Sequence, residues 1–222
     1  MPTIVIASPK GGAGKSTTAV VLGTELARAG AQVTLMDCDP NGSLSLWATR
    51  APVPTRMSLE SGITESEIVR RIRRAEADGA VVVVDLEGVA SRLVSRAISQ
   101  ADLVITPMRA TTLDATIGVR ALHLVAEEEE ALDRHIRHAV VFTMTRAIRS
   151  KQHKGIETSL REQGVDVIMP GLMERAAYSA LFEFGGNLET LPPQGNIAAA
   201  RDEAGRFARA VYDRLVAEEA VA

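Results

Sequence analysis

The stretch that most constrains how this chain can fold is TIVIASPKGGAGKSTTAV, residues 3–20. An apolar run leads into a turn rich in glycine, and the turn leads into residues typical of a helix. Backbone N–H groups in such a turn can point inward together, and the N-terminus of the following helix adds the positive end of its dipole. The stretch therefore predicts a strand, a phosphate-binding loop and a helix of an α/β fold.

The loop departs from the standard phosphate-loop pattern, G-x-x-x-x-G-K-[ST]. Gly14, Lys15 and Ser16 match its end, but Pro9 stands where its first glycine would be. We expect Lys15 to reach the β- and γ-phosphates of a nucleotide and the Ser16 hydroxyl to ligate Mg²⁺. A second lysine, Lys10, lies earlier in the loop and has no role in the standard pattern.

Short runs rich in Val and Ile alternate with helical patterns along the rest of the chain. Continuous apolar runs indicate strands that are covered on both faces. Their alternation with helices predicts right-handed crossovers, so we expect one α/β domain over residues 1–222, with a doubly wound, mostly parallel sheet and helices on both faces. The expected strands span residues 3–8, 32–37, 80–86, 102–107, 139–145 and 165–169, and the expected helices 16–28, 64–77, 91–99, 113–132, 148–163 and 198–217.

Composition excludes several classes of protein. Aromatic residues make up 3% of the chain, too few for a platform that stacks single-stranded bases. The single cysteine, Cys38, can form no internal disulfide and argues against an iron–sulfur cluster. No apolar run approaches the roughly 20 residues that span a bilayer, and the start shows no signal-peptide pattern. We therefore expect a cytoplasmic protein.

The segment KGGAGKST, residues 10–17, resembles the deviant Walker A motif, K-G-G-x-x-K-[ST], of the ParA/MinD family of ATPases. SPKGG, DCDPNGSLSLW, ADLVITPMRATTLD and FTMTR follow in the order seen in small partition-type ParA proteins, typified by ParF. The resemblance is strongest in the first 115 residues and thins out after Arg146. It implies a P-loop NTPase fold of deviant Walker A type, with ATP and Mg²⁺ as cofactors and slow intrinsic hydrolysis. The nucleotide-binding residues that it implies are Lys10, Gly11, Gly12, Ala13, Gly14, Lys15, Ser16, Thr17, Thr145 and Arg146.

The early lysine is a signature of that family. By resemblance, Lys10 crosses a dimer interface and touches the phosphates bound by the other subunit, which implies a homodimer with ATP sandwiched inside. The physical reason is that triphosphate charge held away from water requires additional cations. The alternative is that Lys10 is a solvent-exposed loop residue.

Two carboxylates follow the second expected strand, in VTLMDCDPNGSLSLW. This segment resembles the family's D-x-D-P-Q, with Asn41 in place of glutamine, and ligands of parallel sheets bind at the carboxyl ends of strands. By resemblance, Asp37 helps to hold the metal shell or Lys15, and Asp39 orients the attacking water. Asp39 thus joins Lys10 and Lys15 as an implied catalytic residue. The alternative is that both acids only cap the next helix.

A third carboxylate ends the apolar run of AVVVVDLEGVAS, residues 80–91. Asp85 can hold Mg²⁺ through water, and with Ser16 and Asp37 it completes the expected metal site. Relatives often carry a small residue or proline where this chain has LEG. Glu87 is therefore either a switch residue that senses the γ-phosphate or an exposed turn residue.

A local basic cluster lies in RAIRSKQHKGIETSLR, residues 146–161, which contains five Lys or Arg residues and only one Glu. Each phosphate that such residues neutralise releases counterions, which gives salt-sensitive, non-specific binding to double-stranded DNA. The expected contacts are Arg146, Arg149, Lys151 and Lys154. The alternative is a solvated helix face, as we expect for RRIRR at residues 70–74, which acids flank.

The resemblance implies a nucleoid-associated ParA-type ATPase that positions or partitions a plasmid, a chromosome or a protein cargo. A ParB/ParG-like partner would stimulate its hydrolysis. One alternative is a MinD-like membrane-associated ATPase, although the chain ends YDRLVAEEAVA and lacks the basic amphipathic pattern of an anchor, so no membrane is expected. Another is a metabolic P-loop enzyme of the dethiobiotin-synthetase-like type, for which no substrate-binding constellation is evident.

Overall fold

The computed structural model describes residues 1–88, 91–193 and 195–216, without the side chains of 117 and 119–121. The strands are β1 (Thr3–Ile6), β2 (Val33–Cys38), β3 (Met57–Glu60), β4 (Val81–Leu86), β5 (Leu103–Met108), β6 (Arg137–Thr145) and β7 (Asp166–Met173). The helices are α1 (Lys15–Arg28), α2 (Ser43–Arg50), α3 (Ile68–Ala77), α4 (Arg92–Ile98), α5 (Thr112–Leu132), α6 (Lys151–Glu162), α7 (Ala176–Phe184) and α8 (Ile197–Val216).

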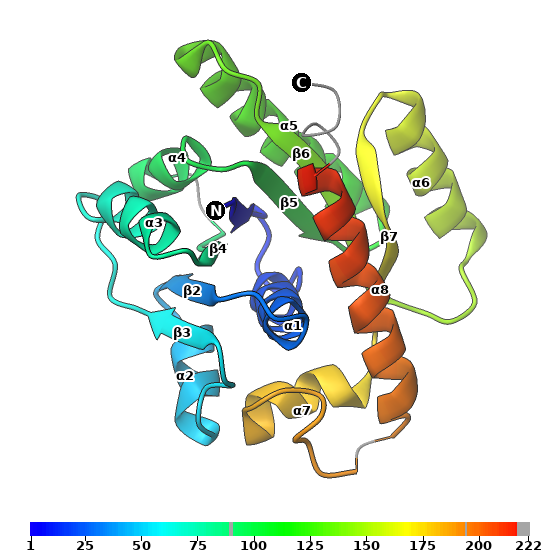
Figure 1. Ribbon diagram of the computed structural model, residues 1–222. Coiled ribbons are helices and arrows are strands. Elements are labelled where there is room, and N and C mark those ends of the chain that lie inside the picture. Colours follow the sequence, from blue (N-terminus) through cyan, green and yellow to red (C-terminus); the bar gives the residue numbers. More distant parts are fainter. Residues whose placement is uncertain (89–90, 194, 217–222) are drawn as a thin grey trace.

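The strands form one sheet in the order β3-β2-β4-β1-β5-β6-β7, and every neighbouring pair is parallel (Figure 1). The strand that precedes the phosphate loop, β1, lies between β4 and β5. Asp37 at the end of β2 is in register with Asp85 at the end of β4. The sheet thus places the phosphate loop and the expected carboxylates together at the carboxyl ends of its strands, which we call the carboxyl edge of the sheet.

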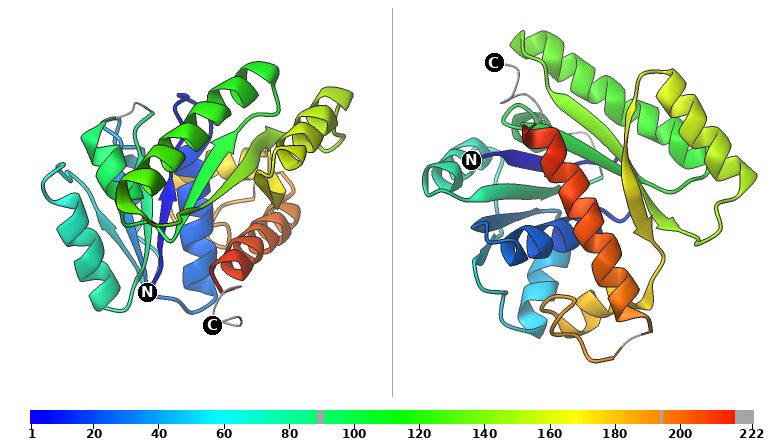
Figure 2. Two further views of the ribbon diagram at one scale, coloured as in Figure 1. Left: turned by 90° about the horizontal axis from the view of Figure 1, so that it is seen from above. Right: turned by 45° about the vertical axis from the view of Figure 1, so that its right-hand side comes forward.

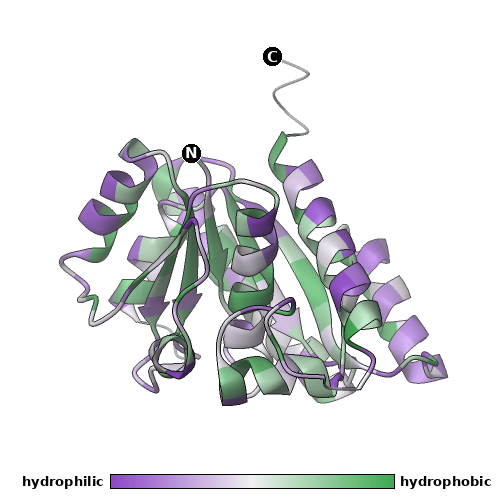
Figure 3. Cartoon of the chain, turned by 60° about the horizontal axis from the view of Figure 1, so that its bottom comes forward, coloured by the Kyte–Doolittle hydropathy of each residue, from purple (hydrophilic) through white to green (hydrophobic). Residues whose placement is uncertain are grey.

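Helices cover both faces of the sheet. Alternate side chains of β1 show the division, because Ile4 and Ile6 pack with α1, α2, α7 and α8, whereas Val5 packs with α3, α4 and α5. The views in Figure 2 show α1 and α8 on one side and α5 on the other, and Figure 3 shows the apolar strands between helices whose outer turns are hydrophilic. The expected doubly wound sheet is confirmed, and within the described residues it is entirely parallel.

The six expected strands are present, with small shifts at their ends. The helix expected from residue 64 begins instead at Ile68, because Thr64 donates its hydroxyl to the Glu67 carboxylate and forms a turn before the helix. The helix expected from residue 148 begins at Lys151, after Ser150, whose hydroxyl accepts the His153 N–H as an N-cap. Three elements lie outside the expected set: α2, β3 and α7.

Candidate nucleotide-binding site

The phosphate loop joins β1 to α1 at the carboxyl edge of the sheet. Gly12 and Gly14 have φ angles of +71° and +89°, a backbone conformation that side chains with a Cβ rarely adopt. Gly14 is the N-cap residue of α1, so the helix begins directly at Lys15. These glycines explain why the chain can turn so tightly between a buried strand and a buried helix.

The loop presents backbone donors. Within the described parts of the chain, the N–H groups of Gly11, Gly12 and Gly14 donate to no backbone carbonyl. A Cβ added to Gly88, after β4, would lie 3.6 Å from Lys15 Nζ and 3.7 Å from the Gly11 nitrogen. Free amides beside a helix N-terminus and a lysine are the groups that bind phosphate.

Asp85 is the most unusual carboxylate of the site. It is fully buried, and among the described residues neither of its oxygens accepts a well-aligned hydrogen bond, although the Ser16 hydroxyl lies close enough to act on its pKa. Burial raises the pKa of Asp85 to about 7, and the Ser16 hydroxyl and the Lys15 ammonium partly offset this effect. A buried carboxylate without a well-aligned hydrogen bond, next to a hydroxyl, fits a divalent cation. Mg²⁺ held by Ser16 and Asp85 would neutralise phosphate charge beside Lys15.

Asp37 has two functions in the fold. One of its oxygens, Oδ2, accepts the backbone N–H of Ser45 at 2.8 Å and the Ser45 hydroxyl at 2.6 Å, which anchors the first turn of α2. The other oxygen, Oδ1, is buried and has no partner among the described residues. Asp37 therefore supports the helix, as the alternative interpretation expected, and its Oδ1 could also take part in binding a cation.

Asp39 lies in the loop after β2 and is partly exposed. Its Oδ1 accepts the Asn41 backbone N–H at 2.9 Å and the Asn41 side-chain amide at 2.8 Å. The carboxylate is thus held within its own turn and keeps its second oxygen for water. Between the two acids, burial raises the pKa of the Cys38 thiol to about 12, so this cysteine is a packing residue.

Lys10 is not a free loop residue. Its Nζ lies 2.6 Å from Oδ1 of Asp114, a carboxylate in the first turn of α5 that is 2% exposed. Thr111, the N-cap of α5, donates its hydroxyl to the other oxygen of Asp114, and the Asp114 N–H donates to Thr111 Oγ1. Sequence reasoning missed Asp114, although Thr111 and Asp114 have the spacing of a capping box.

The other expected contacts lie at the end of β6 and the start of α6. Thr145 is the last residue of β6, at the same edge of the sheet as the phosphate loop, and Arg146 follows it and is exposed. Arg149 is bound to Glu157 at 3.0 Å. Lys151 and Lys154 are exposed and lie three residues apart, on one face of α6.

Glu87, whose role the sequence left open, follows β4 and is partly exposed. Residues 89–90 of the same segment lie outside the described residues, as do residues 217–222 of the acidic end. Among the helices that the structure describes, none has the length and apolar character needed to cross a bilayer.

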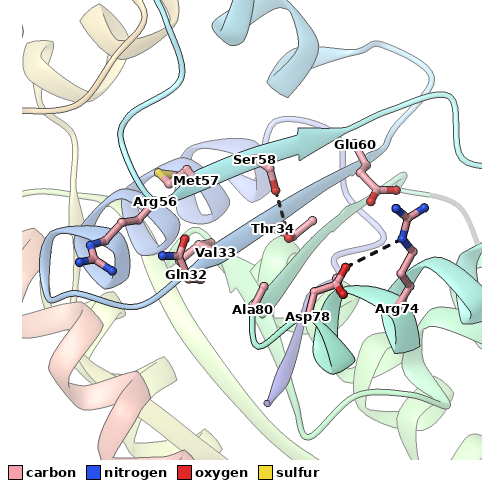
Figure 4. Close-up of a pocket in the computed structure, with 11 residues that line it drawn as sticks. Gln32, Val33, Thr34, Arg56, Met57, Ser58, Glu60, Arg74, Asp78 and Ala80 are labelled. Atoms are coloured by element: carbon pink, nitrogen blue, oxygen red, sulfur yellow. Dashed lines mark hydrogen bonds and ion pairs between the residues drawn. The ribbon is translucent and has the colours of Figure 1, made fainter.

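A cavity of about 480 Å³ lies far from this site (Figure 4). Its lining comes from the first residues of β2 and β3 and from the end of α3, and includes Thr34, Ser58 and Arg74. This is the amino edge of the parallel strands, opposite the phosphate loop. Ligands of parallel α/β sheets bind at the carboxyl ends of the strands, so the phosphate loop, and not this cavity, lies where a ligand of this fold is expected.

Comparisons with known proteins agree with this geometry. Residues 4–188 match the family described as the CobQ/CobB/MinD/ParA nucleotide binding domain, CbiA. The chain is 62% identical over 217 residues to Protein ParA of Rhizobium radiobacter, an alignment that covers 97% of this chain and 98% of that protein.

Solved structures show the same fold. The ATP complex of a McdA variant from Cyanothece has a TM-score of 0.77 at 19% identity and covers 98% of this chain and 96% of its own. MinD cell division protein from Aquifex aeolicus has a TM-score of 0.73 at 19% identity, over 96% of this chain and 97% of that one. The resemblance seen in the deviant Walker A motif is confirmed, and the chain belongs to the CobQ/CobB/MinD/ParA family of nucleotide-binding domains, on its ParA-type partition ATPase side.

Proposed function

We propose that this protein is a Mg²⁺-dependent ATPase whose ATP-bound homodimer binds double-stranded DNA without sequence preference. Hydrolysis is slow until a ParB/ParG-like partner stimulates it, and the cycle positions or partitions a cargo on the nucleoid. The observation that carries the proposal is Asp85, which is fully buried beside the Ser16 hydroxyl and the Lys15 ammonium and whose oxygens form no well-aligned hydrogen bond within the described residues. Such a carboxylate is costly to the folded protein, and a cation bound with nucleotide would offset that cost.

The roles of the site residues follow from where they lie. The loop amides and Lys15 hold the phosphates, while Ser16, Asp37 and Asp85 provide the surroundings of the metal. Asp39, partly exposed and fixed by Asn41, orients the attacking water. Removal of such a group typically lowers a rate about 10²–10⁴-fold and leaves binding intact.

The DNA contact is assigned to the start of α6. Arg149 is neutralised in part by Glu157, so Lys151 and Lys154 are the stronger candidates, since no described residue forms an ion pair with either. Both lysines lie near the carboxyl edge of the sheet, where the nucleotide binds. A dimer would present them twice, and each phosphate contact adds to the salt dependence of binding.

The test measures binding to random-sequence duplex DNA by fluorescence anisotropy. It is done with ATP, with ADP and without nucleotide, each at two salt concentrations. We expect ATP-dependent, salt-sensitive binding that Asp39→Ala preserves and that Lys151→Glu/Lys154→Glu removes. Arg70→Glu/Arg73→Glu on α3 changes the charge by the same amount and should bind like the unmodified chain. Binding that ignores the nucleotide, or that both double variants weaken equally, would contradict the proposal and direct the search to anionic lipid vesicles.

A further inference from the structure

Two side chains to which the sequence motifs assign no role hold the phosphate loop by its carbonyl oxygens. Thr143 on β6 donates its hydroxyl to the Ala13 carbonyl at 2.7 Å, with a longer contact of 3.3 Å to the Met108 carbonyl. Arg109, directly after β5, donates from Nη2 to the Gly12 carbonyl at 3.2 Å. Consecutive peptide groups of the loop are therefore fixed from the same side.

The two contacts determine where the loop amides point. In a trans peptide the C=O and the following N–H point in opposite directions. When the carbonyls of Gly12 and Ala13 are held toward β5 and β6, the N–H groups of Ala13 and Gly14 point away from those strands. On that other side of β1 lies β4, which ends near the buried Asp85. The amides thus face the part of the site where phosphate and cation would meet.

Packing supports the same assignment. Thr143 is buried, and a Cβ added to Gly14 would lie 3.3 Å from Thr143 Cβ. Gly14 has a φ of +89°, so both its conformation and its close approach to Thr143 require glycine. The strand β6 therefore supports the loop directly at the residue that caps α1.

We propose that Thr143 and Arg109 are positioning residues that preset the phosphate loop for the nucleotide diphosphate group. Thr143 has the larger effect because its hydrogen bond is buried, whereas Arg109 is exposed and its hydrogen bond competes with water. The proposal rests on nucleotide binding by this loop, as inferred above. It adds two residues, one on β6 and one in the turn after β5, that contact the loop itself, and the motif segments that contain them assign neither residue a role.

The experiment measures the Kd of Mg·ADP by calorimetry and the ligand-free Tm, both on the full chain. ADP is the probe because it reports on the loop without the γ-phosphate that would drive dimerisation. Thr143→Val, which keeps shape and loses the hydroxyl, should weaken binding about tenfold. Thr143→Ser should restore the Kd to within about twofold of the unmodified chain, and Arg109→Met should weaken binding about threefold.

The matched control is Thr106→Val on the neighbouring strand β5. Thr106 is also fully buried, but its hydroxyl bonds to His138 Nε2 at 2.9 Å and does not touch the loop. This variant should lower the Tm and leave the Kd unchanged. Equal Kd values for Thr143→Val and Thr106→Val would overturn the role of Thr143, and an unchanged Kd in Arg109→Met would overturn that of Arg109. Absence of ADP binding by the unmodified chain would instead overturn the proposed function together with this inference.

Discussion

Lys10 and Asp114 form an ion pair across the base of the phosphate loop, with 2.6 Å between Nζ and Oδ1. The family resemblance implies that Lys10 reaches the nucleotide of a second subunit, so the ammonium group has two competing destinations. Asp114 is buried, and a buried carboxylate that loses its cation is left with an unfavourable charge. In the proposed dimer, the ion pair within one chain would therefore set part of the free energy that dimerisation has to supply.

This competition gives a prediction for Asp114→Asn. Asparagine can still accept the Thr111 hydroxyl, but it no longer attracts Lys10, so ATP-dependent dimers should form at about three- to tenfold lower protein concentration. Sedimentation velocity with ATP measures this shift, in an Asp39→Ala background that prevents turnover. Weaker dimerisation would show that Asp114 orients Lys10 for its partner instead of retaining it.

Asp85→Asn should separate stability from function. The substitution keeps the shape of a side chain that is fully buried and removes a charge that no well-aligned hydrogen bond stabilises among the described residues. The ligand-free Tm should stay constant or rise, while the affinity for Mg·ATP falls at least about tenfold, because a destabilising group has been kept for binding. Calorimetric unfolding without and with Mg·ATP measures the ligand-free Tm and the stabilisation by the nucleotide, and so checks both expected effects. A large fall in the ligand-free Tm would mean that Asp85 supports the fold.

The sequence predicts the fold well where strands are fully buried. The runs before Ser8 and Asp85 are continuously apolar, and the run before Asp37 is interrupted only by the buried Thr34. Such strands in a parallel sheet have few other interpretations. The elements that escape prediction lack that signal. The edge strand β3 has four residues and is only half-buried, and α2 is a short helix whose position depends on the distant bond from Trp47 Nε1 to the Gly186 carbonyl.

The residues of the candidate site also differ in how far the sequence can predict them. Residues in contiguous motifs, such as Lys15, can be assigned from the sequence because their neighbours in the chain are their neighbours in the site. Asp114 and Thr143 contact the loop from 104 and 130 positions away, counted from Lys10 and Ala13. A single sequence contains no pattern that links such distant positions, so these contacts emerge only from the sheet order.

A buried charge pair holds the last two helices to β7. Glu203 on α8 accepts from Arg175, from the Tyr178 hydroxyl and from the Met173 backbone N–H. Arg175→Met would leave this carboxylate, which is 1% exposed, without its cation and should lower the free energy of unfolding by about 2–3 kcal/mol. Urea denaturation measures the loss.

The control for that substitution is Arg209→Met on α8. Arg209 forms an exposed pair with Asp213 at 2.8 Å, which is worth at most about 1 kcal/mol. Similar losses in the two variants would show that the buried network adds no more than an ordinary surface pair.

His138 on β6 should make the fold sensitive to acid. Burial lowers the pKa of His138 to about 4, and the charges of Asp166 and Glu129 oppose this shift. In the unfolded chain the imidazole takes up a proton near its ordinary pKa of 6.5, while in the fold it stays neutral down to about 4. The unfolded state therefore binds more protons over that interval, and stability falls as the pH is lowered through it.

The corresponding measurement is the Tm as a function of pH, from about 7 to about 4.5, for the unmodified chain, His138→Gln and His123→Gln. In this interval the His138 imidazole is protonated only in the unfolded state. A glutamine side chain cannot be protonated, so the first variant should have a flatter profile, even if loss of the contact with Thr106 lowers its Tm at neutral pH. His123 is exposed on α5, and its substitution should leave the slope unchanged. A His138→Gln profile parallel to that of the unmodified chain would assign the acid sensitivity to other groups, because the slope depends only on the difference in bound protons.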